Sequence, residues 1–348
     1  MENKYKIVAD QDIPFIEGIF EPYAEVVYMV GKDITAEDVK DADALLIRTR
    51  TKCDQSLLEG SKIKIISTAT IGTDHIDLEY CKKNFIKVSN AQGCNAGGVM
   101  QYVFSSLYGI SSRKNIKLDG ATFGIIGVGT VGKLVEKMAL YLGFNVLRCD
   151  PPRAELEGEE GFNSLDYLLE NSDVVTIHTP LDETTKNMAN DEFFRKMKPG
   201  AIFINAARGE IVDEAALKAV IPKLGSVIID TWNNEPNVDE ELIEMVDIAT
   251  PHIAGYSYQG KRNGSAFSVR SIARWFGFTS LHYFYPRPDH PDRPSIKLDL
   301  KGKNQGEITA VFQYNYPIFT DDFMFRIAPN NFEKMRAEYK YRTEIYVE

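Results

Sequence analysis

The chain has 348 residues, of which 44% are hydrophobic and 26% charged, so it can bury the cores of two or three domains. Its formal charge of −10 argues against nucleic acid and anionic lipid as partners, because both repel an acidic surface. The sequence has no apolar run long enough to span a membrane, no apolar signal-peptide core, and four cysteines without CxxC or metal-ligand spacing. We therefore expect a cytoplasmic protein with reduced thiols and no metal.

Short apolar runs alternate with amphipathic runs over the first 90 residues, which is typical of a parallel sheet covered by helices. The expected strands are residues 6–10, 25–30, 44–49, 62–68 and 85–89. The expected helices are residues 13–20, 34–39 and 77–84.

A long apolar helix is predicted over 96–109, and the alternation then restarts. Six strands with intervening helices are the pattern of a complete doubly wound dinucleotide-binding domain. The strands are expected at 121–127, 145–150, 173–178, 201–207, 226–230 and 247–251, and the helices at 131–142, 164–170, 191–197 and 213–223.

After a further helix at 264–276, the composition changes. The proline-rich, charged stretch 285–294 is typical of a linker. Strands are expected at 295–302 and 308–316, followed by an amphipathic run at 330–347 with no catalytic-looking cluster. We interpret this tail as a dimerisation appendage, because exposed strand edges and aromatic side chains favour pairing with a second copy. The aromatic residues are Phe312, Tyr314, Tyr316, Phe323 and Phe325.

Gly127, Gly129 and Gly132 form a GxGxxG motif directly after an apolar strand and before a helix. The first glycine permits a tight turn, the second lets the backbone approach a pyrophosphate, and the third lets the helix pack on the strand. The helix start, at Thr130 and Val131, offers N–H groups to the phosphates. The motif therefore predicts a dinucleotide site.

Asp150 ends the next strand, 18 residues after Gly132. A carboxylate there can bind both hydroxyls of the adenosine ribose and would repel a 2′-phosphate, which favours NAD over NADP. The nearby Arg153 leaves NADP as an alternative cofactor. The alternative without any function is a glycine turn followed by a surface aspartate.

Arg208, Glu235 and His252 follow the last three expected strands of this array. Loops at the carboxyl ends of parallel strands line the ligand crevice, so the three side chains can converge. His252 can act as the base that takes an alcohol proton, and Glu235 can orient its imidazole ring. Arg208 can bind a substrate carboxylate. Each alone is more often a structural residue, but together they indicate hydride-transfer chemistry on a 2-hydroxy acid.

The segments 205–213, 230–236 and 251–257, with the glycine motif, resemble the signatures of the D-isomer-specific 2-hydroxyacid dehydrogenases. That resemblance implies an α/β fold in which a Rossmann-type domain is inserted in a flavodoxin-like substrate domain. It assigns 1–95 and 257–285 to the substrate-binding domain, 96–256 to the NAD-binding domain and 286–348 to a small α+β C-terminal domain that forms a homodimer. It also implies Arg208, Glu235 and His252 as the catalytic triad and adds cofactor contacts at Thr179, Ala206, Ala207, Arg208, Asp230 and Gly255.

Further segments, at 42–52, 67–77, 90–96, 149–155 and 332–344, are similar to the erythronate-4-phosphate dehydrogenases of vitamin B6 biosynthesis. This resemblance implies NAD-dependent oxidation of 4-phospho-D-erythronate, with Thr49, Thr70 and Tyr256 as substrate contacts. Another D-2-hydroxyacid dehydrogenase, of phosphoglycerate or glyoxylate/hydroxypyruvate type, is the first alternative. A non-catalytic NAD-sensing interaction protein is the second.

Overall fold

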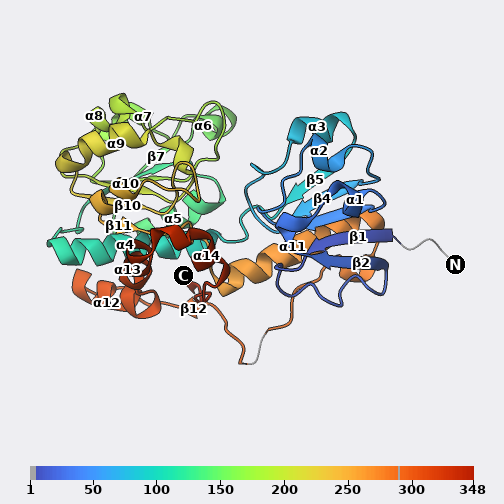
Figure 1. Ribbon diagram of the computed structural model, residues 1–348. Coiled ribbons are helices and arrows are strands. Elements are labelled where there is room, and N and C mark those ends of the chain that lie inside the picture. The colour runs from blue at the N-terminus through green and yellow to red at the C-terminus, as the bar shows by residue number, and fades with distance from the viewer. Residues whose placement is uncertain (1–4, 289–290) are drawn as a thin grey trace. The chain divides into compact units, whose positions relative to one another are not determined.

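The computed structural model describes residues 5–288 and 291–348, which form two compact units (Figure 1). The first unit runs to Asn95 and continues from Tyr258 to Pro294, and the second comprises Ala96–Ser257 and Ser295–Glu348. Residues 1–4, and Asp289 and His290 of the predicted linker, lie outside the described residues. Within the described part of the chain, no helix combines the length and apolar character needed to cross a membrane.

The first unit is built on a five-stranded sheet, in which all neighbouring strands are parallel. Its strand order, β2-β1-β3-β4-β5, is that of flavodoxin-like folds. The strands are β1 (Tyr5–Asp10), β2 (Ala24–Met29), β3 (Ala44–Ile47), β4 (Ile65–Thr68) and β5 (Lys87–Asn90). The helices are α1 (Ala36–Val39), α2 (Gln55–Leu58), α3 (Leu78–Lys83) and α11 (Tyr258–Phe276).

Alternate residues of these strands enter two different cores, because successive side chains of a strand point to opposite faces. Ile7 and Leu46 pack in one core with Val269 of α11. Val8 and Leu45 pack in the other, which also contains buried residues of the short helices α1, α2 and α3. Helix α11, from far along the sequence, thus completes the first unit (Figure 1).

The second unit contains a six-stranded parallel sheet in the order β11-β10-β9-β8-β6-β7. The order reverses at β6, and ligands of open α/β sheets bind at such a switch point. The strands are β6 (Thr122–Ile126), β7 (Asn145–Cys149), β8 (Val174–Ile177), β9 (Ile202–Asn205), β10 (Ser226–Ile229) and β11 (Ile248–Ala249). The helices are α4 (Ala96–Lys114), α5 (Thr130–Tyr141), α6 (Pro151–Glu157), α7 (Leu165–Asn171), α8 (Asp191–Lys196), α9 (Glu214–Val220) and α10 (Glu240–Met245).

Residues 295–348, here called the C-terminal segment, belong to this second unit. Phe312 stacks on Phe104 and Tyr108 of α4, with ring centroids 6.1 and 5.4 Å apart. The segment therefore packs in the same core as the six-stranded sheet. Its elements are β12 (Ile296–Lys297), α12 (Gln305–Asn315), α13 (Ile318–Ile327), α14 (Phe332–Ala337) and β13 (Ile345–Tyr346).

Two predicted elements are wrong. Residues 13–20 form turns rather than a helix, because Phe15 and Gly18 adopt φ values of +65° and +78°, which a right-handed helix excludes. Residues 308–316, predicted as a strand, lie largely in helix α12, which begins with a capping box between Asn304 and Glu307. In addition, only Ile296–Lys297 of the strand predicted at 295–302 is extended in a sheet.

The aromatic residues predicted to be exposed in the tail fall into two groups. Phe312, Tyr316 and Phe325 are buried in the second unit, so for them the prediction of a free surface is wrong. Tyr314 and Phe323 are 89% and 61% exposed. Within α12 the helical period explains the difference, because Phe312 and Tyr314 are only two residues apart and therefore lie on different faces of the helix.

We predict that Phe312→Ala lowers the free energy of unfolding by about 3–5 kcal/mol, since it removes a fully buried aromatic ring. Tyr314→Ala, in the same helix but exposed, is the matched control and should change it by less than about 0.5 kcal/mol. Denaturant unfolding measures both. Equal stability of the two variants would show that the C-terminal segment does not pack in this core.

Candidate active site

The glycine motif lies at the start of α5, and its three glycines differ in how much space surrounds them. Gly127 has a φ of +85°, and a Cβ there would lie 2.8 Å from the His178 carbonyl carbon. A Cβ at Gly132 would lie 2.1 Å from the Gly127 oxygen, so this glycine is required for packing of helix on strand. A Cβ at Gly129, in contrast, would meet nothing within 4 Å. The open space is therefore above Gly129, where backbone can approach a phosphate.

Thr179 follows β8 and borders the same loop. A Cβ at Gly127 would lie 2.9 Å from the Thr179 methyl group. The Thr179 hydroxyl oxygen is buried and has no hydrogen-bond partner among residues 5–288 and 291–348. Because a buried hydroxyl rarely goes without a partner, this atom is suited to a bound ligand. Together with the space above Gly129, it fits a dinucleotide.

Asp150 connects the glycine loop to the end of β7. Its carboxylate accepts hydrogen bonds from the backbone N–H groups of Val128, at 2.7 Å, and Arg153, at 3.1 Å. The Arg153 guanidinium donates to the Val128 carbonyl and pairs with Glu157, at 2.7 and 2.6 Å. Arg153, the residue that left NADP as an alternative, is thus already bonded within the chain.

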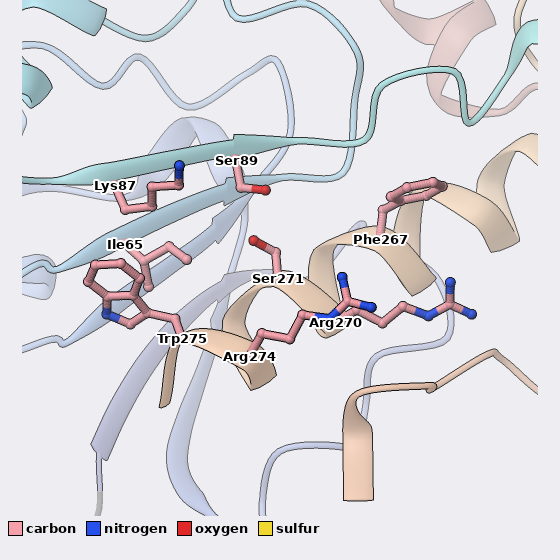
Figure 2. Close-up of a pocket in the computed structure, with 8 residues that line it drawn as sticks. All are labelled: Ile65, Lys87, Ser89, Phe267, Arg270, Ser271, Arg274 and Trp275. Atoms are coloured by element: carbon pink, nitrogen blue, oxygen red, sulfur yellow. The ribbon is translucent and has the colours of Figure 1, made fainter. Parts of the chain in front are cut away.

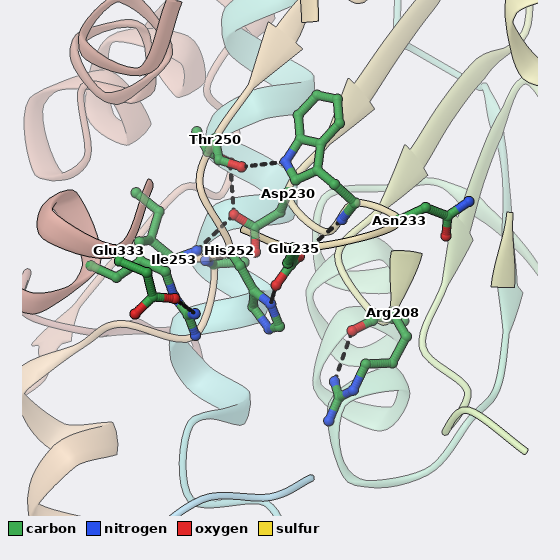
Figure 3. A network of polar contacts seen from close by, with 12 residues as sticks. Arg208, Asp230, Asn233, Glu235, Thr250, His252, Ile253 and Glu333 are labelled. Carbon is green, nitrogen blue, oxygen red and sulfur yellow. Dashed lines mark hydrogen bonds and ion pairs between the residues drawn. The ribbon is translucent and has the colours of Figure 1, made fainter. Parts of the chain in front are cut away.

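His252 and Glu235 form a hydrogen-bonded pair at the carboxyl edge of the sheet (Figure 3). The His252 Nδ1 and Glu235 Oε2 atoms are 2.8 Å apart, and the other carboxylate oxygen accepts from the Trp232 N–H at 2.9 Å. Burial raises the pKa of Glu235, but the His252 imidazole, the Trp232 N–H and the Arg336 charge outweigh it, so the pKa is lowered. Glu235 is therefore a carboxylate that holds one imidazole nitrogen.

Asp230, which follows β10, organises the loop that carries His252. Its carboxylate accepts from the N–H groups of Ile253 and Ala254, at 2.8 and 2.9 Å, and from the Thr250 hydroxyl at 2.7 Å. Its carbonyl accepts from the His252 N–H at 2.7 Å. These bonds hold His252 at a φ of +55°, which non-glycine residues rarely adopt.

Arg208 lies in the loop after β9, and β9 is the neighbour of β10 in the sheet. Its Nη1 donates to the Ala207 carbonyl at 2.8 Å, and the Asn205 side-chain amide donates to the Arg208 carbonyl at 2.9 Å. A Cβ on the next residue, Gly209, would lie 2.0 Å from the Trp232 carbonyl carbon, so this loop touches the one that carries Glu235. The structure thus brings the loops of all three predicted triad residues to one edge (Figure 3).

Thr49 and Thr70, in the first unit, follow β3 and β4, which are neighbouring parallel strands. Thr49 is exposed, and Thr70 is partly buried. The Thr70 hydroxyl lies 2.7 Å from that of Thr68. Both predicted substrate residues are therefore at the carboxyl edge of their sheet.

The C-terminal segment holds the His252 loop from another side, and sequence reasoning missed this. Arg342 is buried and donates to the carbonyls of Ile253, at 3.2 Å, and Ala254. Glu344 accepts from the Ser257 hydroxyl at 2.5 Å. Two charged residues of a segment interpreted as a dimerisation appendage thus bond the loop that carries His252.

Comparisons with known proteins agree with this geometry. Residues 105–254 match the model of the D-isomer specific 2-hydroxyacid dehydrogenase NAD binding domain. Erythronate-4-phosphate dehydrogenase of Bacteroides thetaiotaomicron is 43% identical over 97% of each chain. The chain belongs to the erythronate-4-phosphate dehydrogenase family. The enzyme of that name from Escherichia coli O157:H7 is 38% identical, over 97% of this chain and 92% of the relative.

Among solved structures, NAD-bound 3-phosphoglycerate dehydrogenase of Entamoeba histolytica aligns with a TM-score of 0.68 and 29% identity, covering 80% of this chain and 98% of that one. The comparisons confirm the predicted fold class and the predicted cofactor, NAD. The chain is an NAD-dependent oxidoreductase.

Substitution by alanine should affect NAD binding at one glycine of the motif and stability at another. Gly129→Ala should leave thermal unfolding of the cofactor-free protein nearly unchanged and weaken NAD binding about tenfold or more, because the methyl group enters the space left for phosphate. Gly132→Ala should lower the unfolding temperature, because its Cβ would overlap the Gly127 oxygen. Calorimetry measures both quantities. Unchanged NAD affinity in the Gly129 variant would show that the phosphates bind elsewhere.

Proposed function

We propose that this protein oxidises 4-phospho-D-erythronate to 2-oxo-3-hydroxy-4-phosphobutanoate with NAD, in the biosynthesis of pyridoxal phosphate (vitamin B6). The observation that carries the proposal is the His252–Glu235 pair at 2.8 Å, on the sheet that bears the glycine cradle. The substrate comes from relatives that carry the name of this activity at 38–43% identity over 97% of the chain.

Each triad residue has a distinct task in this proposal. Because Nδ1 of His252 bonds Glu235, Nε2 is the nitrogen that takes the proton of the substrate 2-hydroxyl. Glu235 fixes the ring orientation and stabilises the imidazolium that forms. Arg208 binds the substrate carboxylate through paired N–H groups. Bound NAD supplies the acceptor for the hydride leaving carbon 2.

The remaining predicted contacts would bind the cofactor or the substrate. The pyrophosphate would be held by backbone N–H groups of Gly129, Thr130, Val131 and Gly132. Gly127 would form the turn beside it, because its own N–H donates to the Cys149 carbonyl at 2.8 Å. Asp150 would bind the ribose hydroxyls, while Thr179, Ala206, Ala207, Asp230 and Gly255 would line the nicotinamide side. Thr49, Thr70 and Tyr256 would contact the substrate.

We further propose a homodimer in a reducing compartment, the cytoplasm. Helices α12 and α13 expose several large apolar side chains, and such patches favour association. The residues are Tyr314, Phe323, Met324 and Ile327. The compartment is supported by four cysteines that are all buried thiols rather than disulfides: Cys53, Cys81, Cys94 and Cys149.

His252→Ala and Arg208→Ala should each lower turnover of 4-phosphoerythronate by about 10²–10⁴-fold, since each removes a group that acts on the reacting atoms. NAD affinity should stay within a few-fold for His252→Ala. The assay follows the rise in absorbance of the reduced nicotinamide. Turnover near that of the wild type in either variant would mean that the triad is misassigned.

The same assay separates this substrate from its alternatives, 3-phosphoglycerate, glycerate and lactate. We expect 4-phosphoerythronate to give the highest kcat/KM. Faster turnover of another acid would leave the mechanism in place and overturn the substrate. If none reacts although NAD binds, the non-catalytic alternative gains support.

Phe323→Asp should convert the dimer to a monomer at micromolar concentration, because a charge would then enter the apolar contact. Leu156→Asp places the same charge at a side chain that is 86% exposed on α6, outside the proposed interface, and should leave the dimer intact. Sedimentation velocity measures both. A monomeric wild-type protein would overturn the proposed assembly.

A further inference from the structure

Arg336 is a charged residue of α14 that lies against the loop following His252. Its guanidinium carbon is 5.9 Å from the centre of the Tyr256 ring and 5.5 Å from that of Phe332. Its side chain is only 16% exposed. A cation held this deeply is unusual unless something compensates its charge.

The partners within the chain satisfy this guanidinium only in part. Glu333 is 3.5 Å away and is itself 47% exposed, so it neutralises the charge weakly. The Arg336 Nε is buried and has no hydrogen-bond partner in the described part of the chain. Burial lowers the pKa of Arg336, but the charges of Tyr256, Glu235 and Glu333 and a hydrogen bond with Tyr256 outweigh it, so the pKa is raised and the side chain stays charged.

A phosphorylated hydroxy acid requires such a group. Its phosphoryl group carries about −1.5 to −2 charge near neutral pH, and the chain that must bind it has a formal charge of −10. In the proposed mechanism Arg208 is occupied by the carboxylate. A second cation is therefore needed, and a guanidinium suits phosphate because its N–H groups match two phosphate oxygens.

We propose that Arg336, together with the hydroxyl of Tyr256, is a specificity residue that binds the phosphoryl group of the substrate. This inference rests on the proposed function. Arg336 belongs to the second unit, as do Tyr256 and Glu235.

The first unit offers a competing anion site. A cavity of about 410 Å³ lies beside β4, β5 and α11, and its lining includes the basic side chains of Lys87, Arg270 and Arg274 (Figure 2). Arg274 is exposed and bonds a backbone carbonyl, that of His282, at 3.3 Å. Phosphate binding there would leave no role for Arg336 in specificity.

The test uses Arg336→Gln and Arg336→Lys in the full-length enzyme with NAD. We expect Arg336→Gln to raise the KM for 4-phosphoerythronate and the inhibition constant of inorganic phosphate about 10–100-fold, as for loss of a charge-assisted hydrogen bond. The inhibition constant of unphosphorylated erythronate should change less than about threefold. Arg336→Lys should recover part of the phosphate affinity, because the charge remains.

Two controls remove the same charge elsewhere. Lys334→Gln changes an exposed residue of α14, and Arg274→Gln changes the cavity of the first unit; neither should alter the constants. An equal loss for erythronate and phosphate in Arg336→Gln, or a loss of phosphate affinity in Arg274→Gln alone, would overturn the inference. A wild-type enzyme that prefers another acid would instead overturn the proposed function, so the two failures are distinct.

Discussion

The carboxylate of Asp230 is the constraint on which the candidate site depends. It is 1% exposed, and an ionised group so deeply buried is stable only when hydrogen bonds replace its hydration. Burial raises the pKa of Asp230, whereas the charge of His252 and the hydrogen bonds from Thr250, Ala254 and Ile253 lower it. The effect of burial is the larger, so the pKa is raised. The same bonds that stabilise the buried charge fold the loop around it, so the position of the imidazole follows from the solvation of one carboxylate.

This loop is also supported by the C-terminal segment, which follows it in the sequence. Asp322 of α13 accepts from the Ala249 N–H at 2.8 Å, in the strand that leads to His252. Arg342 then bonds the carbonyls that follow His252, and its guanidinium lies 4.1 Å from the Tyr316 ring centre. The loop is therefore bonded on both its N–H and its C=O sides. A segment outside the matched region 105–254 thus belongs physically to the unit that carries the candidate site.

Much of this could be predicted from the sequence, because the signals were local. The strand–glycine–helix pattern placed Gly127 and Gly132 correctly, and the parallel array placed Arg208, Glu235 and His252 after neighbouring strands. Long-range packing could not be predicted. Nothing in the sequence near Arg342 shows that it bonds Ile253, 89 residues away. The alternating pattern around Phe312 is that of a strand, although the residue lies in a helix and packs against α4. The capping residues Asn304 and Glu307 were a local signal that was overlooked.

The central claim is that the second unit carries out hydride transfer from carbon 2 of a hydroxy acid while His252 takes the proton. The most direct measurement uses 4-phosphoerythronate with deuterium at carbon 2. The account predicts that the deuterium appears on the nicotinamide ring of the reduced cofactor and that turnover of the labelled substrate is slower wherever the chemical step limits the rate. Release of the deuterium to water, with none on the nicotinamide, would contradict it.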